Sequence, residues 1–401
     1  MRDLRPRRAG KNPLGAVLAC ALLLGAATAA PAAPYVPASD SVVLERLPDP
    51  RSAELRELAR LQAARAAAPN DLAPAIALAR RALELGRRDG DPRLVGRAEA
   101  ALAPWLGAGD PPLPVLVLHA TVQQNRHEFS AALATLERVL ERDPRNAQAW
   151  FTRAVIELVR GDPRASLASC ARLAGRIDAL WVNACASQAR SRAGHARESY
   201  DSLADQLAHA ANAPPEQRAW VELTLGEMAV RLGDSRAAEA HMRAALALDP
   251  SDAGARADLA DLLLDAGCPR EARELLAGET RADILILRLA LAEHALGDPE
   301  FETHTSLLEA RAAEARLRGD SVHAREEARL ALEVRGDSAR ALELARASFA
   351  QQREPADARI LLEAARAAGE RTAAEPVLAW LTATGLEDAR LTGLLPREGT
   401  P

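Results

Sequence analysis

Apolar and small residues recur along this chain with the spacing of helix faces, and one stretch repeats the pattern closely. Within residues 216–277, Leu225 and Leu259 are 34 residues apart, and so are Gly233 and Gly267. A fixed period of this length predicts hairpins of two antiparallel helices that stack side by side.

The small residues of this stretch suit such hairpins. Gly226, Ala238 and Ala245 fall where two helices must approach closely, Gly233 suits the left-handed end of a first helix, and Pro250 ends the second helix. The order resembles the tetratricopeptide repeat (TPR), because these five residues stand at its small-residue, turn and proline positions. The aromatic positions of the family are poorly filled, so the resemblance is to exported bacterial TPR-like proteins with degenerate repeats.

The resemblance implies an all-α fold, namely a right-handed superhelical solenoid of antiparallel helix hairpins. We expect about nine hairpins and no strand. The step between Gly297 and Gly319 is only 22 residues, so the number and register of the repeats are open there. Outside the first stretch, the pattern recurs at Leu78-Ala79 with Gly86, His119-Ala120, Arg153-Ala154 with Gly161, Ala186-Ser187 with Gly194, Leu289-Ala290 with Gly297, Ala312 with Gly319, and Leu344-Ala345.

The chain begins with a targeting pattern. Residues 1–29 have a basic start, an apolar stretch and small residues at Ala27-Thr28-Ala29, as in a signal peptide for Sec export. Residues 30–50 are rich in proline and alanine and are expected to be a linker. The remaining segments are an N-terminal TPR-like lobe at 51–211, a C-terminal TPR-like lobe at 212–390 and a capping tail at 391–401.

Export predicts a periplasmic or secreted protein, and the alternative is a membrane anchor formed by an uncleaved signal. Cleavage after Ala29 changes the net charge from −5 to about −9, because residues 1–29 hold five basic residues and one acidic residue. The chain has a single lysine and no basic run. We therefore expect neither nucleic acid nor, after cleavage, a membrane surface as a partner.

Sequence motifs of catalysis and metal binding are not found, whether HExxH, a glycine-rich phosphate loop, a paired-cysteine zinc pattern or a GxSxG elbow. We therefore expect no catalysis, no cofactor and no metal. Arg-Gly-Asp triplets at 160–162, 318–320 and 335–337 fall at predicted turns. There the glycine ends one helix and the aspartate caps the next, so we interpret the triplets as structural.

Two cysteines form a candidate disulfide. The midpoint between Cys170 and Cys185 falls close to a helix break at residues 175–178, and residues equally distant from such a turn sit at the same height in an antiparallel helix pair. They can form a disulfide in an oxidising compartment, or they can be two small buried residues in a tight interface. Cys268 has no evident partner.

The TPR resemblance also implies a concave groove, lined by the first helix of each hairpin, that takes an extended peptide or a partner's helix. Asp258, Asp261 and Asp265 share one helical face, and Arg288 on the next first helix can lie opposite them. The alternative is that these charges pair between repeats and that the tryptophans pack between hairpins. The groove candidates are Trp181, Gln188, Arg192, Trp220, Glu227, Arg231, Asp258, Asp261, Asp265 and Arg288.

These patterns lead to a functional hypothesis, an exported scaffold that binds a partner protein or peptide in its groove and catalyses nothing itself. A second hypothesis is an enzyme, or enzyme subunit, that acts on cell-envelope glycans and requires two carboxylates near a tryptophan. A third is a structural spacer without groove specificity. The sequence leaves the partner and the oligomeric state open.

Overall fold

The computed structural model describes residues 39, 52–107, 109–279, 281–317 and 324–395. The predicted signal peptide, all but residue 39 of the predicted linker up to 50, the Gly319-Asp320 turn and the end of the predicted tail lie outside the described residues. Residues 49–401 form one compact unit, and everything below concerns this unit.

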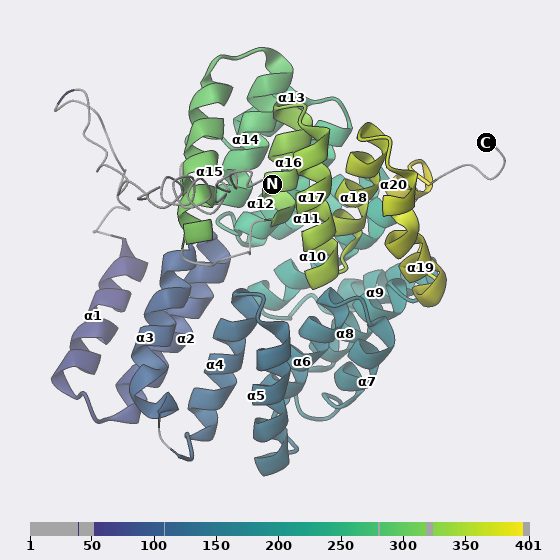
Figure 1. The fold of residues 1–401 in the computed structure, drawn as a ribbon. Coiled ribbons are helices and arrows are strands. Elements are labelled where there is room, and N and C mark those ends of the chain that lie inside the picture. The colour runs from purple at the N-terminus through teal and green to yellow at the C-terminus, as the bar shows by residue number, and fades with distance from the viewer. Residues whose placement is uncertain (1–38, 40–51, 108, 280, 318–323, 396–401) are drawn as a thin grey trace, which may run out of the picture. The chain divides into compact units, whose positions relative to one another are not determined.

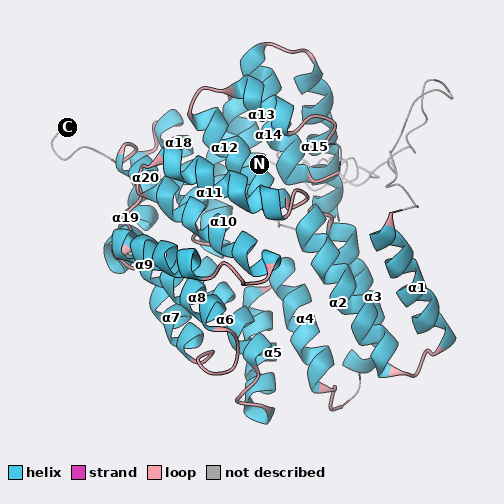
Figure 2. Cartoon of the chain, turned by 180° about the vertical axis from the view of Figure 1, so that it is seen from behind, coloured by secondary structure: helices cyan, strands magenta, loops and turns pink. Residues whose placement is uncertain are grey.

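The described residues form twenty α-helices and no strand (Figure 1, Figure 2). A π-helical turn, η2 (Leu330–Val334), follows α16, and a 3₁₀ turn, η3 (Arg371–Ala374), precedes α19. The α-helices are α1 (Ala53–Ala67), α2 (Leu72–Asp89), α3 (Pro92–Leu106), α4 (Leu113–Asn125), α5 (Phe129–Arg142), α6 (Ala147–Val159), α7 (Pro163–Ala171), α8 (Ala179–Ser191), α9 (Ala196–His209), α10 (Pro215–Arg231), α11 (Ser235–Leu248), α12 (Ala253–Asp265), α13 (Pro269–Leu275), α14 (Asp283–Leu296), α15 (Glu300–Leu317), α16 (Ala324–Arg329), α17 (Ser338–Gln351), α18 (Pro355–Ala367), α19 (Glu375–Thr384) and α20 (Ala389–Thr392).

Helices that follow one another in the chain pack as pairs, and each pair packs on the next. This confirms the predicted all-α, TPR-like solenoid. The predicted boundary between two lobes, at 211 and 212, falls between α9 and α10, which pack against each other. The division into lobes stays a prediction.

The turns between paired helices form as their residues dictate. Gly233 has a φ of 77°, in the left-handed region, and ends the turn after α10. The carboxylate of Asp234 then accepts a hydrogen bond from the backbone N–H of Ala237 and caps α11. Asp162 and Asp337 cap their helices in the same way, so the Arg-Gly-Asp triplets at 160–162 and 335–337 are helix turns.

Two glycines, Gly226 and Gly86, lie inside helices at contacts with a neighbouring helix and not at turns. Gly226 lies inside α10, where an added Cβ would be 3.0 Å from Cγ of Met242, so the small residue permits the close approach of α11. The prediction that Gly86 ends a first helix is wrong. Helix α2 continues to Asp89, and Gly90 ends it with a φ of 63°. Gly86 is also a contact glycine, since its added Cβ would lie 3.2 Å from Cβ of Leu94 in α3.

The last helices form a compact module that returns to earlier repeats. We call residues 324–395 the C-terminal module. Its main hydrophobic cluster is formed by buried residues between Ala328 and Leu391. Figures 1 and 2 show α19 of this module beside α9, far earlier in the chain.

Candidate functional site

The predicted groove residues surround a cavity of about 410 Å³. First helices, together with α11 and the turn before it, form one part of its lining, and the C-terminal module forms the rest. Seven of the ten candidates line it, namely Arg192, Glu227, Arg231, Asp258, Asp261, Asp265 and Arg288. The C-terminal module adds six residues that the sequence did not suggest, namely Arg325, Glu354, Pro355, Ala356, Ala389 and Arg390.

Asp261, in the middle of α12, is the centre of an ion-pair network. Nη2 of Arg288 donates to its Oδ2 at 2.7 Å, and Nη1 of Arg329 donates to its Oδ1 at 2.8 Å. Burial by itself would raise the pKa of this carboxyl group, but the charges and hydrogen bonds of the two arginines hold it well below its usual range. Asp261 is therefore ionised, and each of its carboxylate oxygens accepts a hydrogen bond from an arginine.

Asp258 lies one helical turn earlier and is in the opposite situation. Within the described part of the chain its side chain makes no hydrogen bond or ion pair. Burial, followed by the negative charges of Glu227 and Asp261, raises its pKa to about 8. The cavity thus contains a carboxyl group that lacks a cationic partner and is largely protonated at neutral pH.

Two buried arginines also line the cavity. Arg192 and Arg231 are only 7% and 4% exposed. Arg231 donates from Nη2 to the hydroxyl of Ser191 at 2.6 Å, and burial together with the charge of Arg192 lowers its pKa to about 10. Arg192 forms an ion pair with Glu354 of the C-terminal module at 3.4 Å.

Glu354 and Arg359 connect the C-terminal module to the first helices. Burial would raise the pKa of Glu354, but the charges of Arg192 and Arg325 outweigh burial and lower it. Arg359 donates from Nη2 to Asp265 at 2.7 Å. Several charges on the predicted groove face are therefore matched by the C-terminal module of the same chain.

The remaining candidates lie outside the lining of the cavity. Gln188 donates to the carboxylate of Glu227 at 3.3 Å. Trp181 and Trp220 are half-buried with ring centroids 4.8 Å apart, and Phe151 lies 6.2 Å and 5.7 Å from them. The three rings join α6, α8 and α10, which is the packing alternative that the sequence left open.

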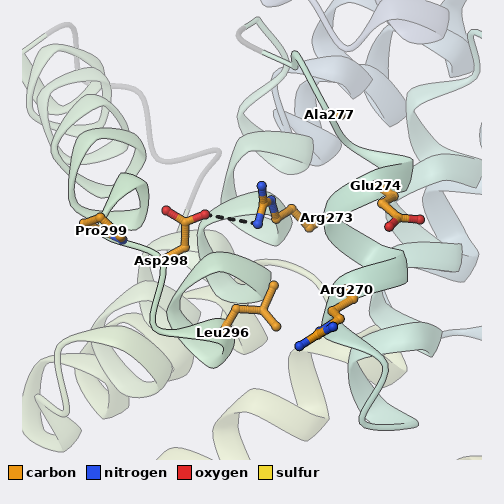
Figure 3. Close-up of a pocket in the computed structure, with 7 residues that line it drawn as sticks. All are labelled: Arg270, Arg273, Glu274, Ala277, Leu296, Asp298 and Pro299. Carbon is orange, nitrogen blue, oxygen red and sulfur yellow. Dashed lines mark ion pairs between the residues drawn. The ribbon is translucent and has the colours of Figure 1, made fainter.

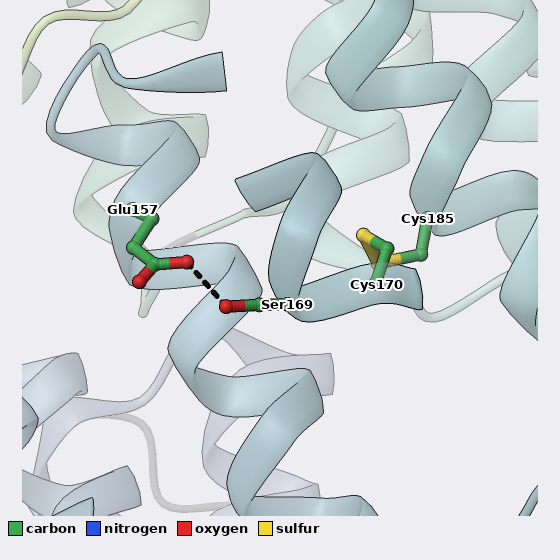
Figure 4. Close-up of a disulfide and its surroundings, with 4 residues drawn as sticks. All are labelled: Glu157, Ser169, Cys170 and Cys185. Atoms are coloured by element: carbon green, nitrogen blue, oxygen red, sulfur yellow. Dashed lines mark hydrogen bonds between the residues drawn. A yellow bond between two sulfur atoms is a disulfide. The ribbon is translucent and has the colours of Figure 1, made fainter. Parts of the chain in front are cut away.

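A disulfide joins Cys170 in α7 to Cys185 in α8, with their Cα atoms 5.8 Å apart (Figure 4). Both cysteines are buried. Beside them Ser169 donates to Glu157 at 2.6 Å, so α6, α7 and α8 are tied together. Cys268 is a free, half-buried thiol.

A second hollow, of about 660 Å³, lies between α13 and the turn after α14 (Figure 3). Within it Arg273 and Asp298 form an ion pair at 3.1 Å. It contains no predicted site residue and no buried carboxyl group without a partner, so we regard the smaller cavity as the candidate site. Its lining residues are Arg270, Arg273, Glu274, Ala277, Leu296, Asp298 and Pro299.

The described residues contain no group of three or more His, Cys, Asp or Glu side chains arranged to hold a metal ion. None of the helices among residues 52–395 that the structure describes combines the length and the apolar character of a membrane span.

Comparison with known proteins gives two matches to the tetratricopeptide repeat family, at residues 117–179 and 229–283. Similar solved structures include PilW, a type IV pilus biogenesis factor, with 23% identity, a TM-score of 0.38 and coverage of 49% of this chain and 92% of that chain. PilF of Pseudomonas aeruginosa has 18% identity and a TM-score of 0.37, and the match covers 49% of this chain and 90% of that chain. A thermophilic TPR protein of Thermus thermophilus has 23% identity and a TM-score of 0.37, and the match covers 51% of this chain and 100% of that chain. No protein of curated function matches the sequence.

Proposed function

Because this chain is a TPR-like protein, we propose that it is an exported scaffold whose cavity binds a cationic segment of a partner protein. TPR folds serve as protein-interaction scaffolds, and rigid packed helices present their side chains without an ordering cost at binding. The observation that carries the proposal is Asp258, a cavity-lining carboxyl group with no cationic partner in the described residues.

The cavity favours a basic group beside Glu227 of α10 and Asp258 of α12. Glu227 and Asp258 both line it, and neither forms an ion pair with an arginine in the described structure. An arginine or lysine side chain of the partner, or its amino terminus, would be attracted to this pair and would lower the pKa of Asp258. Binding would then release a proton from Asp258.

The size and the apolar parts of the cavity favour an extended segment. A volume of about 410 Å³ is in the range of pockets for small ligands, ~300–1,000 Å³. It has room for one or two side chains of a peptide and not for a helix. Val230, Met242, Leu262 and Pro355 also line it and provide apolar contacts beside the basic group.

Export is supported by the disulfide and by the predicted signal peptide. A disulfide between buried cysteines persists in oxidising compartments such as the periplasm. We expect the mature protein to begin at Ala30, which N-terminal sequencing of the protein from the envelope fraction would establish. A mature chain that begins at Met1 would indicate the uncleaved anchor.

The test uses a photo-activated cross-linking amino acid in place of Ala356, which is exposed and lines the cavity. Cross-linking in living cells is expected to give one dominant adduct. Asp258→Asn, which keeps the shape of the side chain but cannot lose a proton to a bound cation, should reduce the adduct by about tenfold or more. Asp261 is unsuitable for this purpose, because its loss would leave buried Arg288 without a carboxylate.

Two controls make the result specific. The same cross-linker at Ala171, an exposed position on α7, should not give the adduct. Asp201→Asn, on the exposed face of α9, should leave the adduct at Ala356 unchanged. An adduct of equal yield in wild type and Asp258→Asn would refute the proposed binding site. No adduct in any sample would favour the spacer hypothesis.

The glycan-enzyme hypothesis has one observation in its favour. A largely protonated carboxyl group, Asp258, lies beside an ionised one, Asp261, as in acid–base pairs of glycosidases. However, Asp261 is engaged by two arginines, and the residues lining the described cavity include no aromatic side chain. Release of soluble fragments from purified cell-wall glycan, lost in Asp258→Asn, would support this second hypothesis.

A further inference from the structure

The C-terminal module contacts a row of turns that belongs to four successive hairpins. We define the turn row as His127, Gly161, Gly194 and Gly233, each at the turn between paired helices. Their successive separations in sequence are 34, 33 and 39 residues. The repeat therefore places equivalent turns side by side along one edge of the solenoid.

Three hydrogen bonds join the module to the first half of this row. Nε2 of Gln351 donates to the carbonyl of His127 at 3.3 Å. The backbone N–H of Arg353 donates to the carbonyl of Val159 at 2.7 Å. The indole N–H of Trp380 donates to the carbonyl of Gly161 at 3.1 Å.

Close approach of the two backbones completes the contact. A Cβ added at Gly161 would lie 2.6 Å from Nε1 of Trp380 and 2.7 Å from Cβ of Arg353. At Gly194 it would lie 3.1 Å from the carbonyl oxygen of Gly385. At Gly233 it would lie 3.3 Å from Cβ of Ala389. All four turns of the row therefore touch the C-terminal module.

This interface is polar, and the apolar cores on its two sides are separate. The main cluster of the module lies between residues 328 and 395. The described clusters of α4 to α11 contain none of these residues. The module instead continues the apolar stacking of α14 through Leu330 and Val334. Parting the module from the turn row would therefore expose little apolar surface, and water can replace the hydrogen bonds that are lost.

We propose that the C-terminal module is a lid that closes the cavity by docking on the turn row and opens when these polar contacts part. Its residues Glu354, Ala356 and Arg390 line the same cavity as Asp258, so opening uncovers the proposed binding face. The lid regulates the site described under the proposed function and rests on it only for its biological role. A partner would bind the open form, and its apparent affinity would be reduced by the fraction of molecules that are closed.

The docking is tested first without any partner. Trp380→Phe removes the indole donor and keeps an aromatic ring in the core of the module. Removing one hydrogen bond is expected to raise the population of the open form by about two- to tenfold. Amide hydrogen exchange should therefore be faster by that factor at Arg353. Trp150→Phe is the matched control, because it removes a similar indole bond, to the carbonyl of Pro144 at 3.0 Å, away from the lid.

Opening of the cavity is measured in the same variants by thiol labelling. Val230→Cys places a thiol of similar size in the lining of the cavity, and Cys268→Ser removes the free thiol of the described residues. Reaction with a maleimide should be about two- to tenfold faster with Trp380→Phe and unchanged with Trp150→Phe. The oxidised protein is used, so that Cys170 and Cys185 stay paired.

The outcomes separate the lid from the proposed function. Equal exchange and equal labelling in the Trp380 and Trp150 variants would overturn the lid, whatever the partner does. Faster exchange and labelling in Trp380→Phe would support the lid. If no adduct then forms at Ala356 in any variant, the proposed function fails and the lid stands. If the adduct forms, its yield should rise severalfold in Trp380→Phe.

Discussion

The contact between Gly161 and the C-terminal module gives a prediction with a matched control inside the same chain. Gly161→Ala adds one methyl group where Nε1 of Trp380 and Cβ of Arg353 would be 2.6 Å and 2.7 Å away. Gly267 occupies the equivalent turn of a later hairpin with a similar φ, 72° against 80°. Nothing lies within 4 Å of a Cβ added at Gly267. Gly267→Ala therefore measures the backbone effect alone.

The magnitudes follow from these two environments. An alanine in the left-handed region costs about 1–2 kcal/mol, and this is the full expected loss of unfolding free energy for Gly267→Ala. In Gly161→Ala the overlap adds about 1–3 kcal/mol, as for other overpacked sites. Trp380 cannot simply turn away, because its ring packs against Phe349 at a centroid distance of 5.7 Å. The module can instead part from the turn row. The additional loss of unfolding free energy in Gly161→Ala is therefore no larger than the free energy of undocking the module.

Urea unfolding followed by circular dichroism at 222 nm measures both variants. Gly161→Ala should lose about 1–3 kcal/mol more than Gly267→Ala, and amide exchange at Arg353 should be faster in Gly161→Ala only. If the module undocks in the native state, less surface is exposed on unfolding and the slope of free energy against urea should fall. Equal losses in the two variants, with equal exchange at Arg353, would refute the docking of the module on Gly161.

Three further predictions concern the cavity and the disulfide. Because folding raises the pKa of Asp258 from about 3.8 to about 8, the folded state binds more protons in this range and stability falls as pH rises through it. Asp258→Asn should match wild type near pH 4 and be more stable at pH 9, by about 1–3 kcal/mol after screening, in urea titrations at each pH. Asp261→Asn should destabilise by about 3–5 kcal/mol in the same assay, since Arg288 stays buried without its carboxylate. Replacing Cys170 and Cys185 by serine should cost about 3 kcal/mol, and wild type with its disulfide reduced should lose as much. Unchanged stability of Asp258→Asn at pH 9 would contradict the raised pKa of Asp258, and unchanged stability of the other variants would contradict the ion pair or the disulfide that they remove.

The hairpins and their turns were predictable from the sequence because they depend on residues close together in the chain. The 34-residue period, the glycine at Gly233 and the cap at Asp234 each act within one repeat. The shared face of the three aspartates follows from helical geometry in the same way. Gly86 shows the limit of this reasoning, because a glycine in a turn and a glycine in a helix contact are distinguished only by the partner helix.

The closure of the cavity was decided by the tertiary structure alone. Glu354 forms an ion pair with Arg192, and Trp380 donates a hydrogen bond to Gly161. The partners of each pair are more than 160 residues apart in the sequence, and no repeat period relates their positions. The raised pKa of Asp258 likewise depends on burial and on charges from other helices. The sequence by itself therefore determined the repeating hairpins and which side chains share a face. The return of the C-terminal module decided which of those charges are paired across the cavity, as Arg192 is with Glu354 and Asp265 with Arg359, because such pairing depends on distances between segments that are not neighbours in the chain.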